Sequence, residues 1–215
     1  MGVELWGTYD DMLSLYEVIS KFWNQKTESN IDGYENRNTL ISGFSYEIRK
    51  AISGSRLTSA TSHITGELIP QLGVKFSWVH FLFSLTAIRY NTKYYKVSKL
   101  DTATLKLLEY WLEKAMLDYD KKGGEELSYF IDGKIDATNE FLYQYMRSIN
   151  MDFFRSSGYK KNFRLLPTIM RRSIEITQEY KHFRMQLKED AEKLKVPTWE
   201  LEFDDKSINY GDERW

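Results

Sequence analysis

The chain has 215 residues, of which 42% are hydrophobic and 15% aromatic, so an intrinsically disordered chain is excluded. Thirty basic and 31 acidic residues leave a formal net charge of −1, which excludes an overall basic field for nucleic acid or anionic lipid. The lack of cysteine excludes disulfides, thiolate metal sites and a cysteine nucleophile, and only three histidines are present for metal binding or acid–base chemistry.

The chain begins with a predicted strand and two predicted helices. Residues 2–6 predict a short strand, and Thr8 with Asp11 forms a capping-box pattern that predicts a helix starting after Thr8. A second helix is expected over residues 35–53. It is expected to end at Gly54, because a left-handed residue is favoured just after a helix.

Two further strands and a buried helix are expected next. Residues 56–65 and 72–76 predict a β-hairpin, because the first segment is rich in serine, threonine and β-branched residues. If the first strand joins this hairpin, a three-stranded sheet results. Ser77 is expected to cap a helix over residues 78–90, which is apolar on nearly all sides and should therefore be central.

The middle of the chain predicts two helices around a turn-rich segment. One helix is expected to start at Asp101 or Thr102 and to end at residues 121–124 (Lys-Lys-Gly-Gly), where cations and glycines favour termination. Residues 125–135 contain an Asp-Gly pair and predict a small hairpin. Asp136 is expected to open the next helix.

The last helix is expected to start at Pro167 and to run to about Lys195, a length of roughly 43 Å. Its apolar residues recur in steps of three and four, close to the seam of a coiled coil. The seam consists of Ile169, Ser173, Ile176, Tyr180, Phe183, Leu187, Ala191 and Leu194. Residues 197–215 then alternate acidic and apolar side chains, which suits an extended strand or a docking peptide, with Trp199, Phe203 or Trp215 expected to be buried as an anchor.

These elements predict an α+β protein that is predominantly α-helical, with a small N-terminal sheet, a helical body and a long C-terminal helix with an acidic aromatic tail. Residues 1–158 are expected to form the main domain, and 159–215 an extension that could belong to the same domain. The chain starts without a signal-peptide pattern, and its most apolar stretch, 76–88, is shorter than the roughly 20 residues of a bilayer span. We therefore expect a cytoplasmic protein that does not contact a membrane.

Candidate catalytic residues are few. They are Glu47, Arg49, Arg56 and His63. A carboxylate or imidazole could act as a base while an arginine holds phosphate, and His80 could lie nearby. The six residues between Arg56 and His63 give a spacing that resembles the Arg–His motif of helical RNases of the HEPN type. The alternative is that the four are surface residues and that His80 is a satisfied core histidine.

Other features bear on binding partners. No zinc-protease, phosphate-loop, nucleophile-elbow or EF-hand motif occurs, so we expect no metal or cofactor and do not favour an enzyme. Residues 155–188 carry nine Lys or Arg against two Glu. Nucleic-acid phosphates could contact Lys160, Lys161, Arg164, Arg171 and Arg172, with Tyr159 and Phe163 available for stacking. The alternative is a solvated helix face, partly neutralised by the acidic tail.

Three blocks of sequence are similar to an uncharacterised bacterial family of about 200 residues. They read GVELWGTYDDMLSLYEVI, GFSYEIRKAISGSR and FSWVHFLFSLTAIRYN, and the likeness covers Val3 to Asn91. The resemblance implies a cytosolic, mostly helical α+β protein. It supplies no catalytic residues.

The sequence favours a non-enzymatic interaction or accessory subunit of a bacterial cytoplasmic assembly, such as a phage-defence system, or a homo-oligomer. The 167–195 seam and the aromatic tail would bind a second copy or another protein. The contact residues would be Ile176, Tyr180, Phe183, Leu187, Trp199, Phe203 and Trp215. The alternative is a nucleic-acid-binding protein or nuclease that uses the basic 155–188 stretch.

Overall fold

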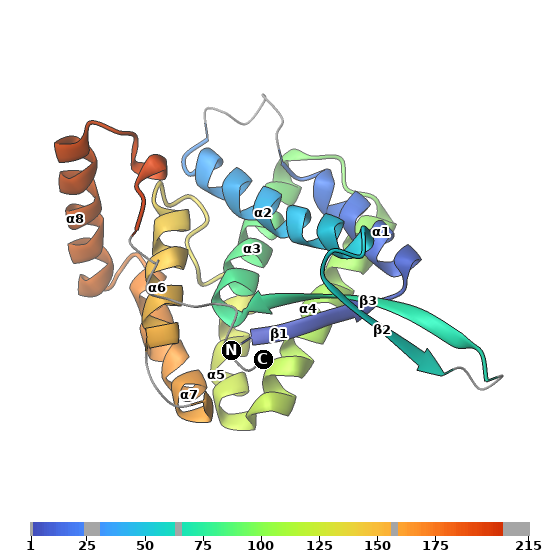
Figure 1. The fold of residues 1–215 in the computed structure, drawn as a ribbon. Helices are drawn as coiled ribbons and strands as arrows, with labels where there is room; N and C mark the ends of the chain where they lie inside the picture. The colour runs from blue at the N-terminus through green and yellow to red at the C-terminus, as the bar shows by residue number, and fades with distance from the viewer. Residues whose placement is uncertain (1, 24–30, 63–65, 156–158, 204–215) are drawn as a thin grey trace.

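The computed structural model describes residues 2–23, 31–62, 66–155 and 159–203 (Figure 1). Its α-helices are α1 (Tyr9–Ser20), α2 (Tyr34–Ile52), α3 (Trp78–Asn91), α4 (Lys99–Tyr119), α5 (Lys121–Ile131), α6 (Leu142–Arg155), α7 (Tyr159–Met170) and α8 (Gln178–Leu194). Short 3-10 segments are η2 (Thr92–Tyr94), η3 (Arg171–Ser173) and η4 (Thr198–Glu200). The strands are β1 (Gly2–Gly7), β2 (Leu57–Ser62) and β3 (Leu68–Ser77). The predicted class, a mainly helical α+β protein with a small N-terminal sheet, is confirmed.

The three strands form one antiparallel sheet in the order β1-β3-β2, so the predicted hairpin and the joining of the first strand are both confirmed. β1 pairs with residues 72–77 of β3, whereas β2 pairs with residues 68–73. The outer part of the β2–β3 hairpin therefore extends past β1 and projects from the helical body (Figure 1). Pro70 lies in that outer part, where its missing N–H faces no neighbouring strand among the described residues.

Local capping signals place the first helices as the sequence predicts. Thr8 and Asp11 form a reciprocal capping box at the start of α1. Gly54 follows α2 with a φ of 71°, the left-handed conformation that glycine adopts without strain. The hydroxyl of Ser77 accepts from the backbone N–H of His80 and caps α3.

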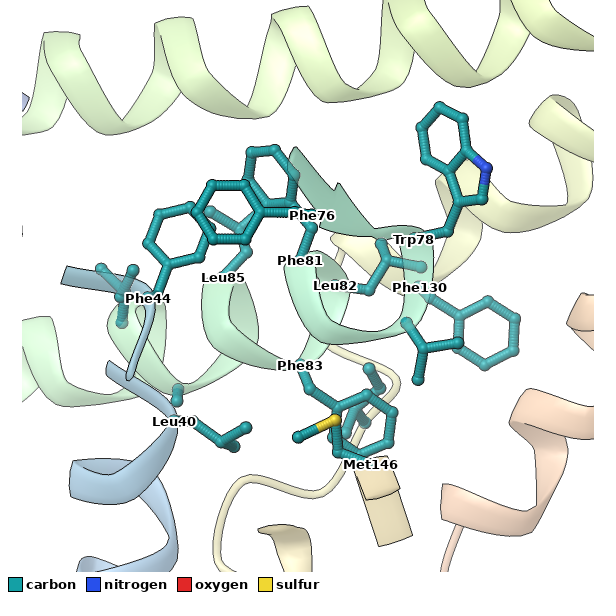
Figure 2. Packing of buried hydrophobic residues seen from close by; sticks show 14 of the residues in the cluster. Leu40, Phe44, Phe76, Trp78, Phe81, Leu82, Phe83, Leu85, Phe130 and Met146 are labelled. Carbon is teal, nitrogen blue, oxygen red and sulfur yellow. The ribbon is translucent and has the colours of Figure 1, made fainter. Parts of the chain in front are cut away.

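The buried helix α3 is the centre of the core, as its all-round apolar pattern predicts. Eleven of its 14 residues are buried. Figure 2 shows side chains on several of its sides: Phe44 of α2 and Phe76 of β3 pack against Phe81, and Met146 of α6 lies beside Phe83. The rings of Phe44 and Phe76 stack with centroids 4.2 Å apart. Helices and sheet therefore share one hydrophobic core.

The segment after α4 differs from its prediction. Residues 121–124 open α5 instead of ending α4, and the predicted hairpin over 125–135 is wrong because α5 continues to Ile131. The carboxylate of Asp120 accepts from the N–H of Gly123 and caps α5. A Cβ on Gly124 would lie 2.7 Å from the backbone carbonyl of Met116, so this glycine lets α5 approach α4 closely.

The helix expected from Asp136 begins later, at Leu142. The side chain of Asp136 instead accepts from the N–H and hydroxyl of Thr138 and stabilises a turn. The amide of Asn36 on α2 then holds the chain, because it donates to the carbonyl of Glu140 and accepts from the N–H of Tyr143. These long-range hydrogen bonds hold the chain before Leu142 outside a helix, so α6 starts at a later residue than the sequence predicts.

The continuous helix predicted over residues 167–195 is wrong. Pro167 lies inside α7, which ends at Met170, and α8 begins only at Gln178. Between them Ile174 is extended, and the hydroxyl of Thr177 accepts from the N–H of Tyr180 and caps α8. The apolar residues of the predicted seam keep their spacing of three and four residues across the break, because α7 and α8 both bury apolar residues in the same core.

The described helices include none that is both long enough and apolar enough to cross a bilayer.

Alanine substitutions at two helical glycines, Gly124 of α5 and Gly43 of α2, should change the stability of the protein in opposite directions. Gly124→Ala should destabilise the protein by about 1–3 kcal/mol, because the new methyl group would overlap the backbone of α4. Gly43→Ala in α2 meets open space and should stabilise the protein by about 0.5–1 kcal/mol through helix propensity. Urea unfolding of both variants tests this, and a Gly124→Ala variant at least as stable as the wild type would contradict it.

Candidate functional site

The catalytic candidates of α2 lie beside a surface hollow between α1, α2 and α3. The hollow measures about 470 Å³, and its lining includes Tyr46, Glu47, Arg49 and His80. Arg56 donates from Nε and Nη2 to the two carboxylate oxygens of Glu47 at 2.6 and 3.0 Å, so the two form a bidentate ion pair. The structure therefore brings together Glu47 of α2, Arg56 of the bend between α2 and β2, and His80 of α3.

The chemistry of this hollow is limited. Burial lowers the pKa of His80 to about 4, against the opposing effect of the Glu47 charge, so His80 is neutral at pH 7. Glu47 already neutralises Arg56, and the Arg49 guanidinium lies 5.3 Å from the ring centre of Tyr46. A neutral imidazole and a paired carboxylate make a weak acid–base pair.

Arg56, the first residue of the RNase-like Arg–His spacing, does not lie in a helix. Arg56 directly precedes β2, which begins at Leu57, whereas the HEPN-type motif belongs to helical enzymes. His63, the second residue of that pattern, lies outside the described residues. The catalytic roles of Glu47, Arg49, Arg56 and His63 therefore stay predictions.

Much of the basic 155–188 stretch is neutralised by acidic residues elsewhere in the chain. Arg164 makes a bidentate pair with Asp120 at 2.8 and 2.6 Å, and its guanidinium is the main reason why the pKa of that carboxyl is lowered. Arg172 pairs with Asp152, and both Arg184 and Lys188 contact Glu140. These cations stabilise the contacts between helices.

The remaining nucleic-acid candidates form a sparse set. Lys160, Lys161 and Arg171 are exposed, and Lys160 lies 5.9 Å from the ring centre of Tyr119. Phe163 is fully buried against Trp78 and Tyr119, so the prediction that it is available for stacking is wrong. The side chain of Tyr159 lies outside the described part of the structure.

The predicted C-terminal seam faces mainly its own chain. Tyr180, Leu187 and Ala191 are buried, and the Tyr180 ring stacks on Tyr145 of α6 at 5.0 Å. Phe183 is partly buried against Tyr145 as well. Ile176 is the main exception, with 85% of its surface exposed.

The aromatic tail is described as far as Phe203. Phe203 stacks on Phe183 at 6.4 Å and lies 5.4 Å from the Arg147 guanidinium, while Leu201 is buried and Trp199 is half exposed. Trp215, the last predicted anchor, lies outside the described residues. The described tail thus packs mostly on α6 and α8.

A different apolar surface lies on α4. Its inner face buries Leu105, Leu108, Leu112 and Met116. A second apolar group stays exposed on the outer side, and it consists of Leu100, Leu107, Tyr110 and Trp111. We call this group the α4 outer face.

The α4 outer face adjoins a groove beside the sheet. The groove measures about 400 Å³, and its apolar lining is Val3, Leu5, Trp6, Phe81, Leu108, Trp111, Leu112 and Ala115. β1 forms one wall and is an edge strand, with no strand on its other side among the described residues. Trp111 links groove and outer face. This surface was not predicted from the sequence, although the spacing of the apolar residues 100, 107 and 111 indicates a second apolar stripe on the same helix.

The described residues contain no group of three or more His, Asp or Glu side chains placed to hold a metal ion.

The lowered pKa of the partly buried His80 predicts a specific pH dependence of stability. Its folded pKa of about 4 lies below the unfolded value of about 6.5, so the unfolded state binds more protons between these values and stability falls as the pH drops. From pH 7 to pH 5 this loss should be on the order of 1–2 kcal/mol, and His80→Gln should abolish it.

Urea unfolding at the two pH values measures the effect, with the exposed His182→Gln as the matched control. An NMR titration of His80 with a midpoint near pH 6.5 would contradict the prediction.

Comparison with known proteins supplies a family. No curated protein and no solved structure matches the chain. The model of a domain of unknown function, DUF6904, matches residues 1–213. This match extends the likeness noted over Val3 to Asn91 through nearly the whole chain, and it agrees with an uncharacterised family. The chain belongs to the DUF6904 family.

Proposed function

We propose that this protein is a non-enzymatic assembly protein that associates with a second copy of itself through the α4 outer face and the adjoining β1 groove. The observation that carries the proposal is the exposure of large apolar side chains on a helix whose opposite face is already in the core. Leu100, Leu107 and Trp111 are 73%, 55% and 51% exposed. Burial of such a side chain brings about 1.5–3 kcal/mol.

The edge of β1 adds support. An uncovered edge strand presents free backbone N–H and C=O groups, and proteins commonly protect such edges with lysine, proline or a covering segment. β1 reads Gly-Val-Glu-Leu-Trp-Gly and contains neither lysine nor proline. No described strand covers this edge of β1, and a docked protein surface would cover both the edge and the groove next to it.

A second copy is the occupant that fits this surface best. In a two-fold dimer the same patch meets itself, so an apolar stripe from one α4 can pack beside the groove of the other. The charged side chains that line the groove are Glu4, Lys114 and Asp118, and Lys114 pairs with Asp118 at 2.5 Å. With a whole-chain charge of −1, like-charge repulsion between two copies is weak.

The wider setting is part of the proposal. The lack of cysteine fits a reducing compartment, which supports a cytoplasmic location. A role in a bacterial accessory system, such as phage defence, stays a prediction. The nucleic-acid alternative has less support because two of its five basic candidates, Arg164 and Arg172, are paired with acidic residues of the chain.

Two charge-introducing substitutions test the proposed surface. Leu107→Glu combined with Trp111→Glu should convert a dimer into a monomer of 25.6 kDa, because each charge would have to be buried unpaired at the interface. Light scattering coupled to size-exclusion chromatography at about 100 μM protein measures the mass; a surface with micromolar affinity is dimeric there.

Two matched controls accompany the test. Tyr129→Glu places the same charge at a 56% exposed aromatic residue of α5, and Ile176→Glu places it on the C-terminal seam. Both should remain dimeric, and circular dichroism should show all variants folded. A monomeric wild type would sink the proposal. So would a dimer that Ile176→Glu dissociates and the α4 variant does not.

A further inference from the structure

A second hollow lies on the other flank of α4, between α3, η2, α4 and the loop that follows α5. It measures about 720 Å³, within the range of roughly 300–1,000 Å³ that is typical of small-molecule sites. Its apolar floor includes Val97, Leu105 and Ile135. We call it the α3–α4 cleft. It does not include the exposed residues of the α4 outer face.

Cations outnumber acids in the lining of this cleft. Arg89, Lys93 and Lys106 face Glu109 and Asp136, a surplus of one positive charge. The Nζ atom of Lys93 lies 4.5 Å from the ring centre of Tyr90, and no carboxylate of the described residues lies within 4 Å of it. Lys93 therefore brings an uncompensated charge to the rim of the cleft.

The other two cations share one carboxylate. Glu109 is only 10% exposed at its side chain, and its two oxygens lie 2.6 Å from Lys106 Nζ and 3.4 Å from Arg89 Nε. An anion entering the cleft can draw Lys106 away without leaving Glu109 unpaired, because Arg89 stays beside it. The desolvation cost of an isolated buried carboxylate is thereby avoided.

The walls of the cleft are fixed by buried hydrogen bonds. Arg37 of α2 is fully buried and donates to the carbonyl of Ala137 at 2.8 Å and to Oδ1 of Asn91 at 2.7 Å. It thereby ties the loop after α5 to the end of α3. The Arg37 guanidinium also lies 4.5 Å from the ring centre of Tyr90, so a further positive charge stands behind the cleft wall.

We propose that the α3–α4 cleft binds a small organic anion, with its phosphate or carboxylate group at Lys93 and Lys106, while Arg89 keeps its contact with Glu109. Lysine supplies point charges that suit both kinds of group. The apolar floor accommodates the rest of the molecule, since a single inorganic ion would leave most of the hollow unfilled. Preorganised walls reduce the ordering cost of binding.

Titration with three probes, followed by amide NMR shifts, tests the site. AMP carries a phosphate, citrate carries carboxylates, and adenosine is an uncharged control. At least one anion should shift Tyr90, Lys93 and Ile135 with a dissociation constant of about 1 mM or tighter, whereas adenosine should bind at least about 10-fold more weakly. AMP and citrate compared with each other identify the preferred acidic group.

Paired variants separate a specific cleft from general charge attraction. Lys93→Ala with Lys106→Ala should weaken anion binding at least about 10-fold, while Lys161→Ala on α7 should leave it unchanged. The proposal fails if neither anion shifts the cleft residues at about 10 mM, if adenosine binds equally well, or if the double variant binds like the wild type. Repeating the titration on the Leu107→Glu, Trp111→Glu variant, whose substitutions lie outside the cleft lining, keeps the result independent of the α4 docking test.

Discussion

The burial of α3 on all sides is the constraint on which the rest of the molecule depends. A helix with this pattern is stable only when other elements cover every face. α2, β3, α4, α5 and α6 provide that cover, and Figure 2 shows side chains of α2, β3, α5 and α6 around α3. Each covering element commits one face to the core. Function is therefore confined to the outer faces and to the hollows between neighbouring elements.

Buried polar contacts give this arrangement its specificity. Arg37 and Asn36 on α2 bind backbone groups about 100 residues away, at Ala137 and Glu140. Asn91, at the end of α3, joins Arg37 to the carbonyl of Phe22. A buried arginine is costly unless its donors are satisfied, so these contacts favour one placement of the loop after α5. That loop forms a wall of the α3–α4 cleft.

Local signals could be predicted from the sequence, and contacts between distant segments could not. The capping box at Thr8, the cap at Ser77 and the apolar pattern of α3 depend on neighbouring residues and were all correct. Gly124 was read as a helix end, because a glycine that terminates a helix and one that admits a neighbouring backbone look alike in sequence.

The same limit applies to the candidate sites. Alternation of apolar residues continues across the break at Ile174, so spacing alone could not separate α7 from α8 or show that the seam is buried. The pairing of Arg164 with Asp120 joins segments 44 residues apart and neutralises a cation that composition alone would leave free to bind phosphate. The second stripe of α4 was readable, since its spacing is local. The α3–α4 cleft was not, because Lys93 and Glu109 meet only through the packing of α3 and α4.

Native-state hydrogen exchange of the α3 amides tests the central role of this helix most directly. If α3 is enclosed by one cooperative core, its amides should exchange only through global unfolding, with free energies equal to that from urea denaturation. The amides of α6 and α7 that face the core should approach the same value. Exchange of α3 at a clearly lower free energy, or a separate earlier opening of α7 and α8 that leaves α3 protected, would contradict a single core organised around α3.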